Sequence, residues 1–269
     1  VTMTGSTAYV AAGLSGMRVI DLSNPAQPRE TYWFNTENAY ANKVITAGNT
    51  AYLTNHLDSN YPLRIFDISD VLHPQKIKDA SYDVEQVFGT AFRSIAMVDD
   101  FLYVAAEYAD IAIDVHDPMD PIIPSALPHE NTNVAAFGNL VAVVNSRDIA
   151  IYSIADPATL QLMNLIERDS GGEGVAFLDQ NTLVVSYDDR VWVFDVSDPS
   201  SPAKRSEIAI PGGAASEIFI TDNTAYIACL GNGILIVDLS DPDQPQTIGQ
   251  VDTHAIANDC YVQGDLMLV

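Results

Sequence analysis

Three carboxylates and one histidine in the second half of the chain have the chemistry to bind a metal ion if the fold brings them together. These residues are Glu173, Glu217, Asp259 and His254. Such ligands suit Ca²⁺ or Mn²⁺, and a site needs about three or four of them around one point. The histidines form no HxH, HxxxH or HExxH pair, so local spacing predicts no zinc motif. The alternative, that these are polar groups without a metal, stays open.

Other catalytic patterns are missing from the sequence. There is no G-x-S-x-G motif for a nucleophilic serine. Residues 171–174 are rich in glycine, but no P-loop lysine follows them. The carboxylate pairs Asp99-Asp100 and Asp188-Asp189 are more typical of turns than of acid–base catalysis. The sequence therefore favours a protein that is not an enzyme.

One phrase, an apolar residue followed by Asp-x-Ser-Asp-Pro-x-x-Pro, recurs at intervals of about 43 residues. Its first aspartate is Asp21, Asp67, Asp114, Asp195 or Asp238, and Ser153 takes this place in a weaker copy. Asp and Ser side chains accept hydrogen bonds from backbone N–H groups just ahead, and Pro presets φ for a turn. A catalytic site would need such a group once, whereas a repeated turn needs it in every copy. We therefore predict that these five aspartates stabilise turns.

Four short segments bounded by turn residues accompany each copy of the phrase. The third segment is a continuous apolar run, as in residues 63–66 (LRIF) and 234–237 (ILIV). Such runs are typical of strands buried on both faces. Four strands repeated at this interval predict an all-β protein, a β-propeller of four-stranded antiparallel blades.

We predict a single β-propeller domain over residues 1–269. Six complete repeats occupy about residues 1–251. Residues 252–269 supply a first and a partial second strand for which a six-bladed ring has no vacancy, so we expect them to start a seventh blade. The rest of that blade is expected beyond residue 269, because an open sheet edge would otherwise be exposed.

The repeated phrases resemble the LVIVD repeat of bacterial and archaeal surface proteins. The best matches are residues 13–23 (GLSGMRVIDLS) and 233–240 (GILIVDLS). The resemblance spans nearly the whole chain, and the repeat around Ser153 departs from it most. It implies a propeller and a place at the cell surface, and it says almost nothing about activity.

Function is expected where the blades differ, at the end of each blade opposite the Asp-Pro turns. The residues that open the innermost strands should ring the mouth of the channel there. We single out Lys43, Arg93, Asn133, Glu173, Glu217 and Asp259. This ring of mixed charge suits a small polar or zwitterionic ligand, or its charges simply compensate one another. Propeller lactonases hold a catalytic metal with a similar ring, so a metal-dependent propeller hydrolase is the alternative function.

The chain is strongly acidic, with 36 Asp and Glu against 12 Lys and Arg and a net charge of −24. Nucleic acid and anionic membrane surfaces are therefore excluded as partners, and no apolar run is long enough to insert into a membrane. The acids are scattered, which favours a solvated surface in salty or extracellular surroundings over cation capture. The two cysteines, Cys229 and Cys260, are expected in adjacent blades, either as buried thiols or as a disulfide.

The sequence as a whole favours a non-enzymatic module at the cell surface or outside the cell, in a bacterium or an archaeon. Its expected partners are other proteins or surface components. No cofactor is predicted for this function, and Ca²⁺ belongs to the alternative.

Overall fold

A computed structural model describes residues 1–37, 39–56, 61–82, 91–168, 173–213 and 215–269. The chain divides into two compact units, Val1–Asn131 and Thr132–Val269, and each is described by itself. The secondary structure of the described residues consists of β-strands. These described residues include no helix that is long and apolar enough to cross a membrane.

The first unit contains three four-stranded antiparallel sheets, which we call blades 1 to 3. Blade 1 is β1 (Thr2–Thr4), β2 (Thr7–Ala11), β3 (Met17–Asp21) and β4 (Arg29–Phe34); blade 2 is β5 (Tyr40–Ala47), β6 (Thr50–His56), β7 (Leu63–Asp67) and β8 (Gln75–Ala80); blade 3 is β9 (Phe92–Val98), β10 (Phe101–Ala106), β11 (Ala109–Asp114) and β12 (Ile122–Pro128). The first strands pack side by side, because β5 contacts both β1 and β9.

The second unit repeats this arrangement in blades 4 to 6 and adds a two-stranded hairpin. Blade 4 is β13 (Asn133–Phe137), β14 (Leu140–Val144), β15 (Asp148–Ser153) and β16 (Gln161–Glu167); blade 5 is β17 (Val175–Asp179), β18 (Thr182–Tyr187), β19 (Arg190–Asp195) and β20 (Ala203–Ala209); blade 6 is β21 (Glu217–Thr221), β22 (Thr224–Ala228), β23 (Ile234–Asp238) and β24 (Gln246–Val251). The hairpin is β25 (Tyr261–Gln263) and β26 (Leu266–Leu268). Again β17 contacts β13 and β21, and β21 contacts β25.

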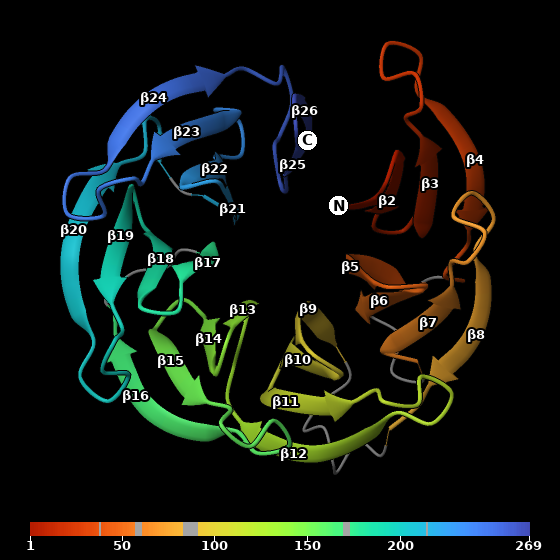
Figure 1. Ribbon diagram of the computed structural model, residues 1–269, viewed down its shortest axis with the longest axis horizontal. Helices are drawn as coiled ribbons and strands as arrows, with labels where there is room; N and C mark the ends of the chain where they lie inside the picture. Colours follow the sequence, from red (N-terminus) through yellow and green to blue (C-terminus); the bar gives the residue numbers. More distant parts are fainter. Residues whose placement is uncertain (38, 57–60, 83–90, 169–172, 214) are drawn as a thin grey trace. The chain divides into compact units, whose positions relative to one another are not determined.

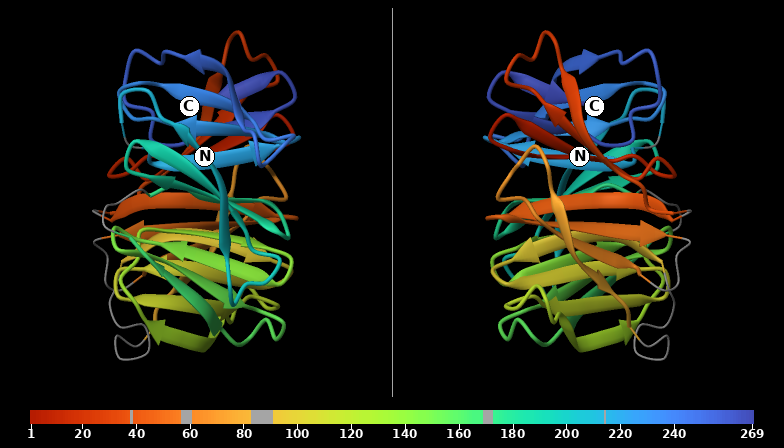
Figure 2. Two further views of the ribbon diagram at one scale, coloured as in Figure 1. Left: turned by 90° about the vertical axis from the view of Figure 1, so that its left-hand side faces the viewer. Right: turned by 90° about the vertical axis from the view of Figure 1, so that its right-hand side faces the viewer.

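The protein is thus all-β, with six four-stranded antiparallel blades of the propeller type. Within each unit the fourth strand of a blade crosses the inner strands at an angle (Figure 2), as the right-handed twist of a sheet requires. Residues 252–269, predicted to start a seventh blade, contain the hairpin β25–β26.

The cores lie between successive blades. The third strands of blades 2, 3 and 4 are buried on both faces, as predicted; in β7, for example, every residue from Leu63 to Phe66 is buried. In β3, β19 and β23 the residues Arg18, Trp192 and Ile236 are only partly buried. One cluster joins Ile65 of blade 2 to Leu102 and Ile111 of blade 3. In the second unit, Val193 of blade 5 packs with Ile227 of blade 6. Burial against a neighbouring blade therefore stabilises each sheet.

The repeated aspartates lie in the turns between the third and fourth strands. The Oδ1 atom of each accepts a hydrogen bond from the backbone N–H two residues ahead, at 2.8–2.9 Å, in Asp21, Asp67, Asp114, Asp195 and Asp238. Hydrogen bonds from the residue two positions ahead hold the pKa of each carboxyl below its usual value. The backbone N–H has the largest effect on Asp21, Asp67 and Asp114, and the serine side chain has the largest effect on Asp195 and Asp238. In blade 4 the hydroxyl of Ser153 accepts the equivalent bond from Ala155 over 3.4 Å.

We call this end of a blade its turn end. The opposite end, where the first and third strands begin, is its loop end.

Candidate functional site

Asn133 and Glu217, two of the predicted ring residues, contact each other at the loop end of the second unit. They are the first residues of β13 and β21, in blades 4 and 6. The Nδ2 atom of Asn133 lies 3.2 Å from Oε1 and 3.3 Å from Oε2 of Glu217. Asn133 is buried, with 5% of its surface exposed. The amide therefore donates to a carboxylate that comes from a blade two positions away.

Gly174, just before β17 of the intervening blade, packs closely against the start of β21. A Cβ atom added to Gly174 would lie 2.7 Å from Cγ1 of Ile218, closer than side chains pack. The backbone N–H of Gly174 donates to Oγ of Ser186 over 2.8 Å, and Ser186 is fully buried. The sequence analysis placed the pair Glu173 and Gly174 at the opening of an innermost strand and chose Glu173, and it missed Ser186.

The ring side chains of the second unit also bond to the start of their own strands. Oδ1 of Asn133 accepts the N–H of Val134 over 2.9 Å. Oδ1 of Asp259 accepts the N–H of Cys260 over 2.8 Å, and Oε1 of Glu217 accepts from the following N–H over 3.4 Å. Such local bonds fix the direction of each side chain at the strand opening.

The four proposed metal ligands do not form one group. Among the described residues, no three His, Cys, Asp or Glu side chains are arranged to hold a metal ion. Glu173 is exposed. His254 is also exposed; its φ is +58°, and its Nδ1 atom lies 3.3 Å from Oδ1 of Asp252. Without a common centre, no hydrolytic step can be derived from these residues.

The two predicted cations, Lys43 and Arg93, belong to the first unit. The N–H of Lys43 donates to Oγ1 of Thr54 over 3.1 Å. Nη2 of Arg93 lies 3.4 Å from Oε1 of Glu107, and both side chains are about one-third exposed. Arg93 therefore has an acidic partner at the loop end of its own blade.

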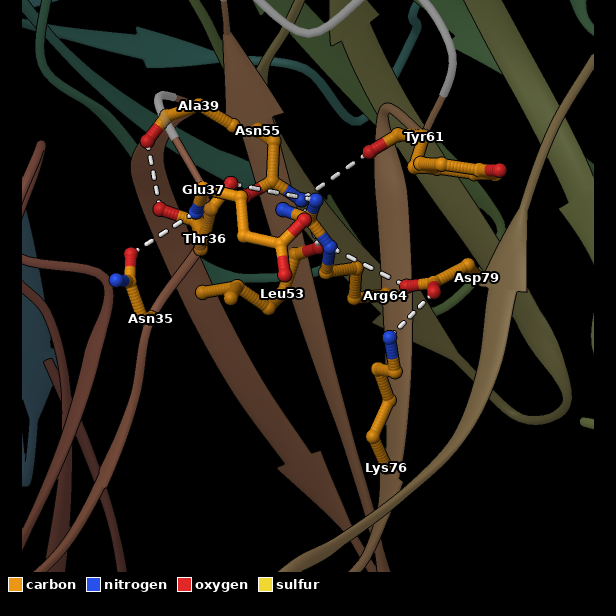
Figure 3. Close-up of polar contacts among 10 residues, drawn as sticks. All are labelled: Asn35, Thr36, Glu37, Ala39, Leu53, Asn55, Tyr61, Arg64, Lys76 and Asp79. Atoms are coloured by element: carbon orange, nitrogen blue, oxygen red, sulfur yellow. Dashed lines mark hydrogen bonds and ion pairs between the residues drawn. The ribbon is translucent and has the colours of Figure 1, made fainter.

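Arg64 forms a polar cluster at the loop end of blade 2 that the sequence analysis did not identify (Figure 3). Only 4% of the residue is exposed. Its Nε atom lies 3.2 Å from Oδ1 of Asp79, its Nη2 atom donates to the carbonyl of Thr36 over 3.4 Å, and its guanidinium lies over the ring of Phe34. Lys76 contacts the same aspartate. The cluster fixes the connection from blade 1 to the loop end of blade 2.

A second buried group lies at the loop end of blade 3. Asp110 is 1% exposed. Its Oδ2 atom lies 3.0 Å from Nδ1 of His129, and its Oδ1 atom accepts from Nδ2 of Asn131 over 2.5 Å. This aspartate ties the start of β11 to the segment that follows β12.

Arg168 is the buried charge of the second unit. It donates to the carbonyls of Ser186, over 3.0 Å, and of Asn145. Burial lowers the pKa of its guanidinium, and the nearby Asp148 acts in the opposite direction. A buried arginine with carbonyl acceptors joins blade 4 to blade 5.

Both cysteines are buried thiols. Cys229 belongs to the core cluster shared with blade 5, and burial raises the pKa of its thiol. Cys260 belongs to the cluster on the opposite face of blade 6, with Ala228 and Ile234. The sheet separates the two thiols, which explains why no disulfide joins them.

The family model of the LVIVD repeat matches residues 1–36, 181–207 and 212–253. The chain carries LVIVD repeats. The matched segments cover blade 1, most of blade 5 and blade 6, so the LVIVD motif explains the Asp-Pro turns at their turn ends. Arg64, Asp110 and Arg168 themselves lie outside the matched segments.

Solved structures share the fold at low sequence identity. A protein from Lactobacillus plantarum is 13% identical with a TM-score of 0.75, over 92% of this chain and 81% of that one. A candidate 6-phosphogluconolactonase from Bacteroides fragilis is 14% identical with a TM-score of 0.74, over 95% and 84%. The computationally designed protein Ika8 is 11% identical with a TM-score of 0.70, over 99% and 78%. No curated protein matches the sequence significantly. These similarities concern the fold alone.

Proposed function

We propose that this LVIVD-repeat chain is a non-enzymatic binding and assembly module that works at the cell surface or outside the cell. One observation carries the proposal: each repeated aspartate is engaged by its own turn backbone, as Asp238 is by Ser240 at 2.8 Å. The repeated carboxylates therefore stabilise the turns. We place the binding of a ligand or partner at the loop ends, where the blades differ. The net charge of −24 suits surroundings that are salty or extracellular.

Glu217 is the group that we place at the centre of recognition. Its carboxylate is oriented by the amide of Asn133 and by a backbone N–H. These bonds fix the direction of the carboxylate at the start of β21. A carboxylate so oriented attracts an ammonium or guanidinium group and forms charge-assisted hydrogen bonds with it. The ligand or partner group expected here is therefore cationic or zwitterionic.

A thermal-shift series tests this assignment. Spermidine, arginine and lysine are added to wild-type protein, Glu217→Gln and Asp238→Asn, and the midpoint of unfolding is recorded. At least one probe should raise the midpoint of the wild type, since a ligand that binds the folded state stabilises it. The shift should disappear in Glu217→Gln and persist in Asp238→Asn, which changes the same charge at a turn end. Equal shifts in all three proteins would contradict a site at Glu217.

We also propose that the hairpin β25–β26 is the start of a seventh blade. Ala257 forms an antiparallel bridge with Leu230 of blade 6, as Ala41 at the start of blade 2 does with Gly13 of blade 1. Cys260 and Met267 pack against the free face of blade 6. The hairpin therefore packs on blade 6 in the same way as blade 2 packs on blade 1.

A further inference from the structure

The fourth strand of blade 4, β16, is an edge strand that lacks the usual protection against further pairing. It pairs with β15 alone (Figure 1), so one row of its backbone groups faces no other strand of the described chain. Natural edge strands block such a row with charged side chains or proline. Residues 161–166 (QLMNLI) have neither. Four of the other fourth strands have at least two such residues: Arg29 and Glu30 in β4; Lys76, Lys78 and Asp79 in β8; Pro124 and Pro128 in β12; Lys204, Arg205 and Glu207 in β20.

Two further features of the fourth strands do not separate β16 from the rest. A register irregularity occurs in the pairing of the third with the fourth strand in each of the six blades, β16 included. The strand β24 also has no charge or proline, but Gly249 lies within it, and a glycine weakens a strand. Among the described fourth strands, β16 thus stands out by its uninterrupted, uncharged and largely apolar sequence.

Two leucines of β16 take the place of an ion pair. By the register of strand pairing, the places of Leu162 and Leu165 in blades 2 and 5 hold Lys76 with Asp79 and Lys204 with Glu207. Both of these pairs are in contact, so the two places are neighbours on one face of the sheet. Leu162 is 51% exposed and Leu165 46%. They therefore form an exposed apolar pair.

The exposure of this pair does not follow from a missing blade. In the sequence, blade 4 lies between two described four-stranded blades, as blades 2 and 5 do. Other residues of β16 are held by blade 5: Ile166 packs against the core cluster that blades 4 and 5 share, and Nδ2 of Asn164 donates to the carbonyl of Ser200 over 2.8 Å. The strand is thus fixed in position while its two leucines stay exposed.

The charge and the sequence of β16 favour a second copy of this chain as its partner. There is no ionisable side chain between Asp156 and Glu167. In an antiparallel pair centred between Met163 and Asn164, Leu162 lies opposite Leu165 of the second copy. Glu167 then lies opposite Leu160 of the second copy, so no two carboxylates face each other. Apolar pairs across two strands stabilise a sheet, whereas like charges there destabilise it.

We propose that β16 pairs antiparallel with β16 of a second copy and joins two blades 4 into one continuous sheet. A two-fold axis between the strands makes the interface self-complementary, which is the commonest arrangement of homodimers. Backbone hydrogen bonds supply affinity in such strand addition, and the four leucines select the register. The inference goes beyond the proposed function, because it concerns how one module joins another and does not involve Glu217.

The test is the oligomeric state of wild-type protein and of a variant with Leu162→Lys and Leu165→Glu. This variant gives blade 4 the ion pair of blade 5 and keeps the net charge. It should fold, because Lys204 and Glu207 occupy the same places in blade 5. The control, Thr247→Lys with Gln250→Glu, introduces the same pair at the corresponding places of β24. Sedimentation equilibrium at several salt concentrations measures the dissociation constant of the dimer.

The wild type and the control should dimerise about tenfold or more tightly than the variant of β16. Added salt should favour the dimer, because it screens the repulsion between two chains of net charge −24. The amides of β16 should exchange with solvent more slowly in the wild type than in the variant.

A wild type that stays monomeric up to about 0.5 mM would overturn the proposal. A dimer of equal affinity in the variant of β16 would do the same. Glu217→Gln should dimerise as the wild type does. A failed thermal shift at Glu217 therefore counts against the Glu217 site alone, and a failed dimer counts against β16 alone.

Discussion

The blades that match the LVIVD repeat differ from the unmatched ones in what they bury at their loop ends. In the described residues the buried charged side chains are Arg64, Asp110 and Arg168, and all of them lie between the matched segments 1–36 and 181–253. The Asp turns, in contrast, occur in both groups. The turn ends are thus alike in matched and unmatched blades, whereas the loop ends differ in their buried charged residues. We therefore place ligand or partner binding at the loop ends.

Arg18 and Arg64 differ in what packs on them, because Arg64 contacts Phe34 and Thr36 of the blade before its own, and Arg18 has no described contact of this kind in the first unit. Each is the second residue of a third strand that ends at the turn aspartate. The side chain of Arg18 is 30% exposed and that of Arg64 is 5% exposed. Arg64→Ala leaves Asp79 and the carbonyl of Thr36 without their buried cation, so we expect a loss of about 3 kcal/mol in the free energy of unfolding.

Arg18→Ala is the matched control for Arg64→Ala. Because its ion pair with Glu30 is largely solvated, the loss should stay below about 1 kcal/mol. Urea denaturation of both variants measures the two values. Equal losses would show that packing against the preceding blade adds no stability at this position.

Gly174→Ala probes the contact between blades 4 and 6. The new Cβ would press on Ile218, so we expect a loss of about 2 kcal/mol and a weaker response to the probes of Glu217. Gly249→Ala is the control, because its Cβ would meet Ile236 at an ordinary 3.5 Å. Unfolding midpoints and thermal shifts of the two variants should differ. A Gly174→Ala protein that behaves like Gly249→Ala would show that Gly174 does not support the site.

Most of the fold was predictable because each repeat carries the signals for its strands and turns in its own local sequence. The spacing of Asp21, Asp67 and the later copies located every third strand. The apolar runs correctly identified burial on both faces for β7, β11 and β15, but β3, β19 and β23 are partly exposed on one face. The contact between Asn133 and Glu217 was only partly predictable. The position of both residues at the start of a first strand followed from the repeat, whereas the close packing at Gly174 depends on the tertiary structure. The bonds of Arg64 and Asp110 join residues about 20 positions or more apart, and no local pattern signals them.

A finer comparison lies within the matched blades, at Gly13 and Leu230. Both have positive φ, +57° and +49°. Gly13→Leu should be destabilising because the ring of Tyr40 occupies the space that a side chain needs. The same change in a Tyr40→Ile background should cost about 1 kcal/mol less. A double-mutant cycle by urea denaturation measures this coupling, and a value of zero would show that the ring of Tyr40 does not restrict residue 13.

The smallest expected effect is the contribution of a turn aspartate to the pH dependence of stability. Hydrogen bonds from Ser69 lower the pKa of Asp67 in the folded protein. The folded state therefore gains stability from this carboxylate at pH values above the unfolded pKa of about 4. That stability is lost as the pH falls through the lower folded value. Asp67→Asn keeps the acceptor but does not titrate, so its urea midpoint should fall less than that of the wild type between pH 7 and pH 3. Identical pH profiles would argue against the turn bond as the cause.

The central claim of the proposed function is that the loop ends bind a ligand or partner and catalyse no reaction. Hydrolysis of sugar lactones by wild-type protein and by Glu217→Gln, each with added Ca²⁺ or Mn²⁺, tests this claim most directly. The account predicts that both proteins leave the lactones at their spontaneous rate of hydrolysis. A metal-dependent rate in the wild type that is lost in Glu217→Gln would contradict it and would identify a propeller hydrolase.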